Sequence, residues 1–542
     1  MTGLSDDPKG GLRPTSTAVA NLAHFVTRGS RRLAGKPALI VGEAAWTWRE
    51  FDERVSAFAA ALAARFAVTK GDRVLVQSQN CHQMFEAMFA CFRLGAVYVP
   101  TNFRQTPDEV AYLCEASGAR VMICNAGFPE HASACRASNA PPQHLIAIGE
   151  ADFGESYDRL VETHLGERVK NAEVDRDDPC WFFFTSGTTG RPKAAVLTHG
   201  QMAFVVTNHL CDLMPGTGPD DVSLVVAPLS HGAGVHQLTQ VAAGATTVLL
   251  PSERFDPAEV FDLIARWRVT NMFTVPTIVK RLVEHPAAMS ADHNSLRYVI
   301  YAGAPMYRAD QKRALEVLGP CLVQYFGLGE VTGNITVLPA AEHSAADGEG
   351  VRVGTCGFER TGMEISIQNE AGEALALGET GEICVRGPAV FAGYFDNPEA
   401  NRKAFRGGWF RTGDLGHLDE AGYLFITGRA SDMYISGGSN VYPREIEEKI
   451  LAHPQISEAA VFGVPDPAWG EVGIAVLVAE EGASVSEAEI GDYLAARISR
   501  YKLPKRFVFL DEMPKSAYGK ITKKLVRQTL EERGLLQTKI DA

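Results

Sequence analysis

The chain has 542 residues, which is too long for a single hydrophobic core, so about two to four domains are expected. Its net charge of −13 argues against nucleic acid as the main partner. Its ten cysteines form neither a Cys-x-x-Cys pair nor a Cys/His cluster with zinc spacing, which favours a reduced, cytoplasmic setting. We also expect no signal peptide and no membrane span, because no apolar run reaches about 18 residues.

The first third of the chain alternates between strand and helix patterns. Residues 1–17 are expected to form a loose arm. Thr47 and Glu50 have capping-box spacing and begin a helix over 51–66. Further helices are expected over 82–94 and 109–117, and strands over 73–77, 96–99 and 120–124. This alternation indicates parallel α/β layers.

A loop rich in glycine and hydroxyl groups follows, between apolar runs at 181–184 and 194–197. It carries the polar or flexible residues Thr185, Ser186, Gly187, Thr188, Thr189, Gly190 and Lys193. Glycines, hydroxyls and a mobile ammonium make a plausible cradle for a polyphosphate. A Walker loop is excluded, because Arg191 and Pro192 separate the last glycine from the lysine. A plain surface loop remains the alternative.

The middle of the chain continues the alternation. Helices are expected over 201–213 and 257–267, and strands over 221–227, 245–250, 272–275, 298–301 and 322–326. Several of these strands end in small, flexible loops. In open α/β sheets, ligands gather at the carboxyl ends of strands.

The secondary-structure pattern of the sequence changes after about residue 350. Short strands with glycine turns over 351–386 predict a small β-rich subdomain. Beyond a boundary at 428–432, helices over 445–451 and 487–498 and strands over 456–463 and 473–479 predict a small α+β domain. The predicted fold is therefore α/β: a large N-terminal domain at 1–428, a hinge at 429–432 and a small mobile C-terminal domain at 433–542.

The string Thr-Ser-Gly-Thr-Thr-Gly-Arg-Pro-Lys at 185–193 resembles the phosphate-binding signature of the AMP-forming adenylating enzymes. These are the acyl-CoA synthetases, firefly luciferase and the adenylation domains of peptide synthetases. Other motifs of this family appear in the right order, at 324–330, 409–414, 428–429, 436–447 and 514–521. The resemblance covers about residues 38 to 527.

This resemblance implies a nucleotide site. It assigns the phosphates to the loop at 185–190 and Lys193, the ribose to Asp414 and Arg429, and magnesium to Glu330 and Thr185. The resemblance also assigns nucleotide contacts to Gly303, Ala304, Pro305, Gln324, Tyr325, Phe326 and Gly327, and places Gly437 and Gly438 beside the thiol route. Lys520 would stabilise the charge that builds on the α-phosphoryl oxygens during displacement.

Two positions depart from the family pattern, and several residues have simpler interpretations. Gly329 replaces the usual threonine, and Ser431, followed by Asp432, replaces the usual hinge residue. Asp414 is otherwise a turn aspartate, and Gly437 and Gly438 are otherwise a glycine turn. Lys520, near Lys523 and Lys524, is otherwise part of a solvated basic face.

The acyl site is expected around His231, which gates it in the family. His231 follows Ser230 directly, so the two are poorly placed to form a catalytic Ser–His pair, and a hydrogen-bonded structural histidine is the alternative. The pocket candidates implied by the resemblance are His231, Gly232, His236, Gly303, Tyr325, Gly329 and Gly333. Their glycines predict a roomy site for a fatty or a bulky cyclic or aryl acid.

The predicted function is an ATP-dependent acid–thiol ligase that uses ATP, Mg²⁺ and coenzyme A, with Lys520, Glu330 and His231 as catalytic residues. A carboxylate would attack the α-phosphorus to give acyl-AMP and pyrophosphate, and coenzyme A would then displace AMP. One alternative is an acyl-AMP ligase that loads a carrier protein. Another is a non-catalytic nucleotide-binding regulator, which only Gly329 and Ser431 support. The expected partners are small molecules, and a homodimer is left open.

Overall fold

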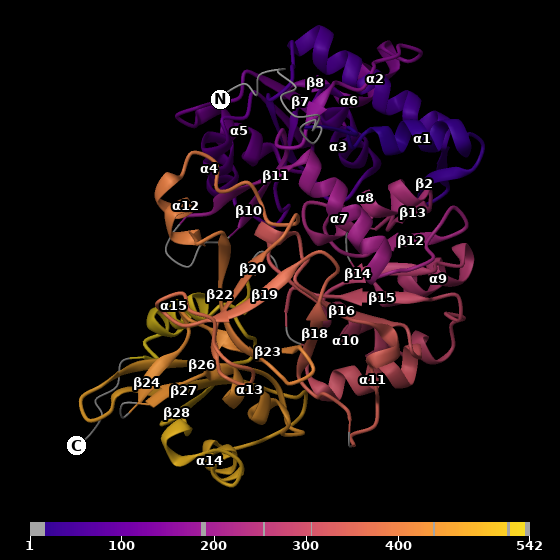
Figure 1. The fold of residues 1–542 in the computed structure, drawn as a ribbon. Coiled ribbons are helices and arrows are strands. Elements are labelled where there is room, and N and C mark those ends of the chain that lie inside the picture. The colour runs from indigo at the N-terminus through magenta and orange to yellow at the C-terminus, as the bar shows by residue number, and fades with distance from the viewer. Residues whose placement is uncertain are drawn as a thin grey trace, which may run out of the picture.

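The computed structural model describes residues 17–185, 191–252, 255–304, 306–348, 350–436, 439–516 and 521–536. Two large sheets form the upper and middle parts of the molecule, and a third, smaller sheet follows them in the chain (Figure 1). A short pair of strands, β1 (Ala18–Val19) and β9 (Val174–Asp175), lies outside these sheets.

The first sheet has seven strands in the order β11-β10-β5-β4-β6-β7-β8. All its neighbours are parallel except β10 and β11, which are antiparallel. The strands are β4 (Arg73–Gln77), β5 (Val97–Pro100), β6 (Val121–Asn125), β7 (His144–Ile148), β8 (Glu155–Ser156), β10 (Pro179–Thr185) and β11 (Lys193–Thr198). The predicted phosphate loop connects β10 to β11.

The second sheet has fourteen strands and includes the β-rich stretch that was predicted as a subdomain. Its parallel part contains β2 (Pro37–Val41), β12 (Val222–Val225), β13 (Thr246–Leu249), β14 (Asn271–Thr274), β15 (Tyr298–Tyr301) and β16 (Leu322–Phe326). The remaining strands pair antiparallel: β3 (Ala44–Thr47), β17 (Thr336–Leu338), β18 (Thr355–Glu359), β19 (Glu364–Gln368), β20 (Gly381–Arg386), β21 (Phe405–Arg406), β22 (Trp409–Leu418) and β23 (Tyr423–Arg429). The β-rich stretch joins the parallel strands edge to edge because β17 pairs with both β16 and β18.

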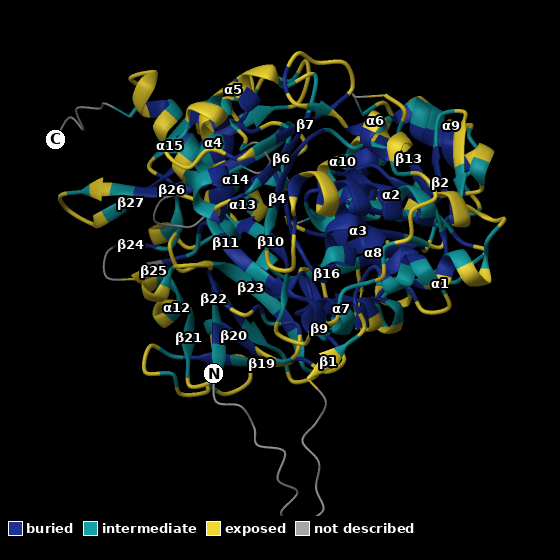
Figure 2. Ribbon diagram, turned by 90° about the horizontal axis from the view of Figure 1, so that it is seen from above, coloured by how far each residue is buried: buried dark blue, intermediate teal, exposed yellow. Residues whose placement is uncertain are grey.

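Helices fill the space between the two sheets and cover their outer faces. The middle layer contains α1 (His24–Arg32), α2 (Trp48–Phe66), α3 (His82–Leu94), α7 (His199–Asp212) and α8 (Gly232–Ala243). Residues 83–93 of α3 are all buried, as expected for a helix packed on every side (Figure 2). The short helix α6 (Tyr157–Thr163) packs against α2, and its buried residues share the core of the middle layer. The outer helices are α4 (Pro107–Ser117) and α5 (Pro129–Ala137) on the first sheet, and α9 (Pro257–Trp267), α10 (Pro276–Glu284) and α11 (Arg308–Leu318) on the second.

The C-terminal part has its own five-stranded sheet and its own buried cores. The chain leaves the second sheet at Arg429 and enters this one at Tyr434. Its strands are β24 (Tyr434–Ser436), β25 (Ser439–Val441), β26 (Ile456–Asp466), β27 (Gly470–Ala479) and β28 (Arg506–Phe509). The helices of this part are α13 (Pro443–Leu451), α14 (Glu487–Ala495) and α15 (Lys523–Glu532). The one remaining α-helix in the described ranges, α12 (Pro398–Ala404), comes earlier in the chain, between β20 and β21 of the second sheet.

Most predicted elements are confirmed to within a few residues. The capping box is present, because Thr47 accepts from the Glu50 amide and Glu50 accepts from the Thr47 amide. The sequence analysis did not assign α1, α8, α10, α11 or α15. None of the helices in the described ranges has the length and apolar character that crossing a bilayer requires.

Candidate active site

Strand pairing brings the two ends of the predicted phosphate loop together. Thr185 is the last residue of β10 and Lys193 the first of β11, and the two are direct partners across the antiparallel pair. The loop residues 186–190, which carry most of the predicted phosphate contacts, lie outside the described residues. The hydroxyl of Thr185 and the ammonium of Lys193 therefore flank this loop.

One oxygen of Glu330 accepts two hydrogen bonds. Glu330 lies in a short 3-10 helix, Gly329–Val331, that follows β16, and it is only 6% exposed. Its Oε1 accepts from the Thr185 hydroxyl at 2.7 Å and from the Tyr394 hydroxyl at 2.9 Å. Burial, then the charge of Glu330, raises the pKa of Tyr394, so that hydroxyl stays protonated and donates. Lys193 Nζ lies 4.3 Å from the centroid of the same tyrosine ring.

The space beside Gly329 is occupied by an aromatic ring. A Cβ atom at this position would lie 2.6 Å from Cδ1 of Phe183 and 2.9 Å from Cγ2 of Thr185. Phe183 and Thr185 are two residues apart on β10 and face the same side of the sheet. Gly329 therefore makes room for Phe183, and a threonine at this position would collide with it. The hydroxyl of Thr332 is hydrogen-bonded to the Val331 carbonyl, 2.7 Å away.

Two other predicted pocket glycines, Gly232 and Gly333, also lie against aromatic rings. A Cβ atom at Gly232 would lie 2.6 Å from Cζ of Phe273, and one at Gly333 would lie 2.3 Å from Cε2 of Tyr325. The rings of Phe273 and Tyr325 are stacked, with centroids 6.0 Å apart. The expectation that these glycines leave open space is therefore wrong. They let aromatic rings approach the backbone closely.

The two predicted pocket histidines have different surroundings. His231 is half-buried at the N-terminus of α8, and its ring centroid is 4.8 Å from that of Phe183. His236 is 1% exposed, and its Nε2 lies 3.0 Å from the Asn271 Oδ1. Burial lowers the pKa of His236 to about 4, so its ring is neutral near pH 7. His236 lies behind Phe273, at a ring-centroid distance of 6.3 Å, within a buried polar network.

Asp414 and Arg429 are brought together by the β22–β23 hairpin. They are direct register partners, and Arg429 Nε lies 2.9 Å from Asp414 Oδ1. Asp414 is buried while the arginine side chain is 44% exposed. A carboxylate paired with a guanidinium in this way can accept hydrogen bonds from a diol.

The remaining predicted nucleotide contacts lie at the carboxyl ends of β15 and β16. Gly303 and Ala304 are exposed just beyond β15. Gln324 is the register partner of Tyr301, whose hydroxyl donates to the Gln324 Oε1 at 3.1 Å. Phe326 is half-buried at the end of β16. A Cβ atom at Gly327 would lie 2.4 Å from the Gly333 Cα, so these two backbone segments touch.

Four other predicted positions lie outside the described residues: Pro305, Gly437, Gly438 and Lys520. The predicted hinge is described. Ser431 is exposed, and its hydroxyl donates to Asp432 Oδ1 at 3.2 Å.

Tyr394, Phe183 and Phe273 were not predicted from the sequence as site residues. Tyr394 is 64 residues from Glu330, and no pattern links the two. Phe183 was assigned only as part of an apolar strand, where alternation predicts a face but not a neighbour. Arg360 was not predicted either; it is 1% exposed and has its Nε 3.6 Å from Oδ2 of Asp212 on α7.

Magnesium has few protein ligands available at this site. The described residues contain no group of three or more His, Cys, Asp or Glu side chains arranged to hold a metal ion. The carboxylate of Glu330 and the hydroxyl of Thr185 are oxygen donors of the kind Mg²⁺ prefers. Mg²⁺ commonly takes one or two protein oxygens and completes its shell with phosphate and water, so the residues present fit this ion.

Comparison with known proteins agrees with this geometry. Residues 26–395 match the family of AMP-binding enzymes, and residues 445–520 match the AMP-binding enzyme C-terminal domain. A feruloyl-CoA synthase from an Amycolatopsis species is 36% identical, covering 94% of this chain and 98% of its own. The long-chain-fatty-acid–CoA ligase FadD13 of Mycobacterium tuberculosis is 34% identical, covering 85% and 88%. The o-succinylbenzoate CoA synthetase MenE of Bacillus subtilis, solved with its acyl-adenylate OSB-AMP, has a TM-score of 0.82 and 30% identity, covering 96% and 99%.

Proposed function

Because the chain belongs to the AMP-binding enzyme family and is an AMP-forming acyl-CoA ligase, we propose a role for each half of its site and a class of acid. The enzyme joins a small carboxylic acid to coenzyme A through an acyl-AMP, with ATP as the energy source. One observation carries the assignment. Two neighbouring residues contact β10: Gly329 lies against the ring of Phe183, and the buried carboxylate of Glu330 accepts from Thr185.

The nucleotide half of the site comprises Thr185, Lys193, Glu330, Asp414 and Arg429. We assign the polyphosphate to the loop between Thr185 and Lys193, with Thr185 and Glu330 holding a magnesium ion that offsets phosphate charge when bound. Tyr394 helps to orient the Glu330 carboxylate by donating to the same oxygen as Thr185. Asp414, oriented by Arg429, accepts the ribose hydroxyls. We assign further nucleotide contacts to Gly303, Ala304, Pro305, Gln324 and Phe326, with the Phe326 ring against the base.

Lys520 is assigned to the first chemical step. The acid's carboxylate oxygen attacks the α-phosphorus, and the bond to the bridging oxygen breaks to release pyrophosphate. The ammonium of Lys520 stabilises the charge that builds on the α-phosphoryl oxygens. In the second step the thiol of coenzyme A attacks the acyl carbon, AMP leaves, and the thiol proton passes to solvent or AMP.

Between the two steps, the C-terminal domain is proposed to rotate about residues 429–432. Ser431 is exposed, and its side-chain hydrogen bond is local to Asp432, which suits a backbone that must turn. Gly437 and Gly438 would then line the thiol route. A carrier-protein thiol is the competing acceptor, and free coenzyme A is distinguished from it by direct assay.

The acid is proposed to be a flat aryl or arylalkenyl acid. The rings of Phe183, Phe273 and Tyr325 lie against Gly329, Gly232 and Gly333, so this region is rich in aromatic side chains. Stacking contributes about 0.5–1.5 kcal/mol per aromatic pair beyond area burial, so such side chains favour a planar ring. The name of the feruloyl-CoA synthase relative supports this class, while FadD13 keeps long-chain fatty acids as the second candidate.

The test is acid-dependent pyrophosphate release from ATP, with and without coenzyme A, across acetate, octanoate, benzoate and 4-hydroxycinnamate. Lys520→Ala is expected to lose about 100- to 1,000-fold in kcat. Lys524→Ala, which removes an exposed lysine from α15, is the matched control and should retain full activity. Equal activity of the two variants would contradict the role of Lys520. Faster release with octanoate than with either aromatic acid would contradict the proposed class.

Two further expectations remain predictions. A cytoplasmic setting is supported by ten cysteines that are all free, eight of them buried. A homodimer stays a prediction that none of the described residues tests.

A further inference from the structure

A cavity lies among the helices in the N-terminal part of the molecule, away from the residues assigned to adenylation. It measures about 440 Å³ and is lined by α1, α2, α3 and the segment 168–171. We call it the basic pocket. Figure 1 shows α1, α2 and α3 at the top, whereas β22 and β23, which carry Asp414 and Arg429, lie lower in the molecule.

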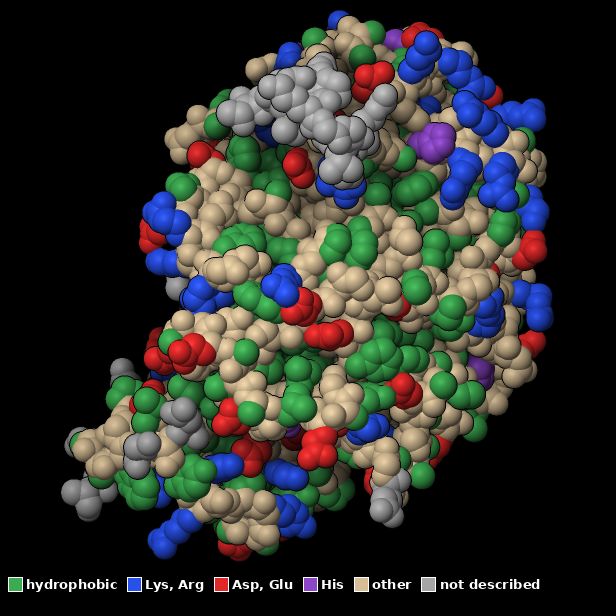
Figure 3. All heavy atoms as spheres, in the orientation of Figure 1, with side chains coloured by type: hydrophobic (Ala, Val, Ile, Leu, Met, Phe, Trp, Pro, Cys, Tyr) green, Lys and Arg blue, Asp and Glu red, His purple; other side chains and the backbone are tan. Residues whose placement is uncertain are grey.

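The lining of the basic pocket is strongly cationic. Arg31, Arg93, Arg168 and Lys170 line it together with a single carboxylate, Asp52. This balance opposes the net charge of −13 that the whole chain carries. Figure 3 shows Lys and Arg side chains gathered at the upper right of the molecule, over the region where Figure 1 places α1 and α2. Such a concentration of one sign in a concave site attracts anions.

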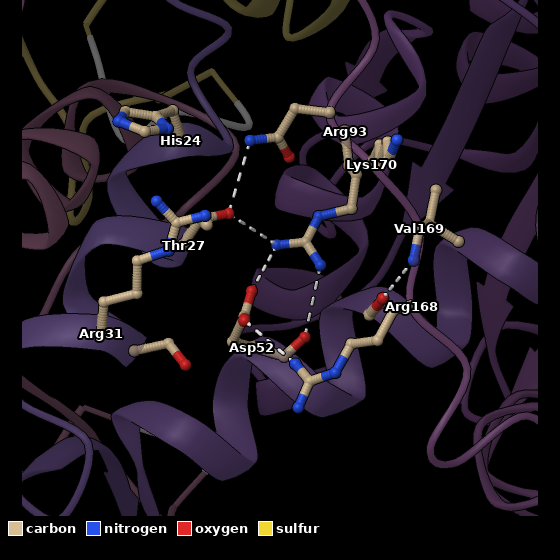
Figure 4. A pocket seen from close by; sticks show the side chains of 11 residues that line it. His24, Thr27, Arg31, Asp52, Arg93, Arg168, Val169 and Lys170 are labelled. Atoms are coloured by element: carbon tan, nitrogen blue, oxygen red, sulfur yellow. Dashed lines mark hydrogen bonds and ion pairs between the residues drawn. The ribbon is translucent and has the colours of Figure 1, made fainter.

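The carboxylate in the pocket is already neutralised. Arg93 Nη2 lies 2.5 Å from Asp52 Oδ1, and Arg168 Nη1 lies 3.4 Å from Asp52 Oδ2 (Figure 4). Arg168 Nη2 also lies 3.0 Å from Oε1 of Glu53, so both arginines are paired with carboxylates. Among the described residues, Arg31 and Lys170 form no ion pair and carry no such compensation. The basic pocket therefore has an excess of positive charge that is available to a ligand.

The floor of the pocket is ordered and polar. The Arg93 side chain is 3% exposed, and its Nη2 also donates to the Thr27 hydroxyl at 3.4 Å. Arg93 Nε and Asn171 Oδ1 are buried and have no hydrogen-bond partner. Because both atoms are shielded from solvent, a ligand is expected to contact the exposed side chains of Arg31 and Lys170 instead.

We propose that the basic pocket binds a phosphoryl group carried by a small polar molecule, at a site separate from the adenylation site. Guanidinium groups bind phosphate oxygens bidentately, and Lys170 adds a mobile point charge. A volume of about 440 Å³ falls in the usual range of about 300–1,000 Å³ for small-molecule sites. Thr27, Ser30 and Asn171 offer hydroxyl and amide groups for the rest of the ligand.

The test is calorimetric binding to the full chain in the absence of ATP and acid, at low ionic strength. The probes are inorganic phosphate, glucose 6-phosphate and fructose 1,6-bisphosphate, with glucose as the uncharged reference. Arg31→Gln/Lys170→Gln removes the two pocket cations that have no ion pair. Arg402→Gln/Lys449→Gln removes two exposed cations elsewhere and is the charge-matched control.

At least one phosphate-bearing probe is expected to bind the wild type and the control variant equally, and to bind the pocket variant at least about tenfold more weakly. Affinity should fall as salt rises, because exposed charges are screened. The proposal is overturned if no probe binds, or if the pocket variant binds as tightly as the control. The readout does not depend on pyrophosphate release, so this outcome is independent of the proposed function.

Discussion

The two proposed halves of the adenylation site are held together by different kinds of interaction. In the nucleotide half, Glu330 accepts from Thr185 and Tyr394, and Arg429 pairs with Asp414. In the acyl half, which we define by His231, Phe183, Phe273 and Tyr325, ring edges and faces pack against glycine backbone. The first half depends on which atoms donate and accept, and the second depends on volume and shape.

This difference explains why a motif identifies one half better than the other. A hydrogen-bonded carboxylate tolerates few substitutions, because a buried group without its partner costs about 1–3 kcal/mol. Packed rings tolerate changes of similar volume at a cost below about 1.5 kcal/mol, so chains with the same chemistry can differ freely there. The nucleotide half should therefore determine the reaction, and the acyl half should determine the acid.

The largest effect on stability is expected at Asp212, the residue of α7 that pairs with Arg360. This residue accepts from the Thr361 amide and hydroxyl and neutralises the buried guanidinium of Arg360. Asp212→Ala leaves that charge buried without its ion-pair partner and should cost about 3–5 kcal/mol in the free energy of unfolding, measured by urea denaturation. Glu364→Ala breaks a surface pair with Arg386, with both side chains about half exposed, and should cost less than about 1 kcal/mol. Similar losses in both variants would mean that Arg360 is not held as described.

The next largest effect concerns the nucleotide half. Glu330→Gln keeps the side-chain shape but removes the charge that we propose holds magnesium beside the phosphates, and should lower kcat by about 100-fold, or about 3 kcal/mol. Tyr394→Phe removes one of the two hydrogen bonds to the same oxygen and should cost about 1 kcal/mol, or roughly fivefold. A Tyr394→Phe defect as large as that of Glu330→Gln would show that the tyrosine does more than orient the carboxylate.

The boundary between the halves is tested by restoring the family's threonine at position 329. Gly329→Thr should lower kcat/KM by about tenfold, because the new side chain collides with Phe183 at an overpacking cost of about 1–3 kcal/mol. Phe183→Ala/Gly329→Thr relieves the collision and should recover pyrophosphate release relative to Gly329→Thr alone. Higher activity of the single Gly329→Thr variant than of the wild type would show instead that the missing hydroxyl limits the enzyme.

The smallest effect is a pH dependence from the buried network behind Phe273. His236 has a folded pKa of about 4, below its unfolded value of about 6.5, so the unfolded chain binds the proton first. Its contribution to stability is complete above about pH 6.5 and is lost as pH falls towards 4, at up to about 1.4 kcal/mol per pH unit. Urea denaturation at pH 7.5, 6 and 5 should show a shallower loss in His236→Gln than in the wild type. Parallel pH profiles would contradict the assignment.

The sequence predicted the fold and the nucleotide half better than it predicted the acyl half. Alternation and turn residues predicted β4, α3, β15 and β16 to the residue, because local periodicity determines them. Thr185 and Glu330 were paired only through the family resemblance, and the structure places their side chains in contact. The positions of Tyr394 and Phe273 depend on strand order and tertiary packing, which no local pattern encodes. The glycines at 232, 329 and 333 were interpreted as space because a sequence does not show which ring faces them.

The most direct test of this division is kcat/KM for pyrophosphate release across acetate, octanoate, benzoate and 4-hydroxycinnamate in the wild type, Glu330→Gln and Phe273→Leu. Glu330→Gln should lower all four values by the same factor and keep their order. Phe273→Leu should change the order and favour octanoate over the aromatic acids. A reordering by Glu330→Gln, or a uniform loss in Phe273→Leu, would contradict the claim that one half determines the reaction and the other the acid.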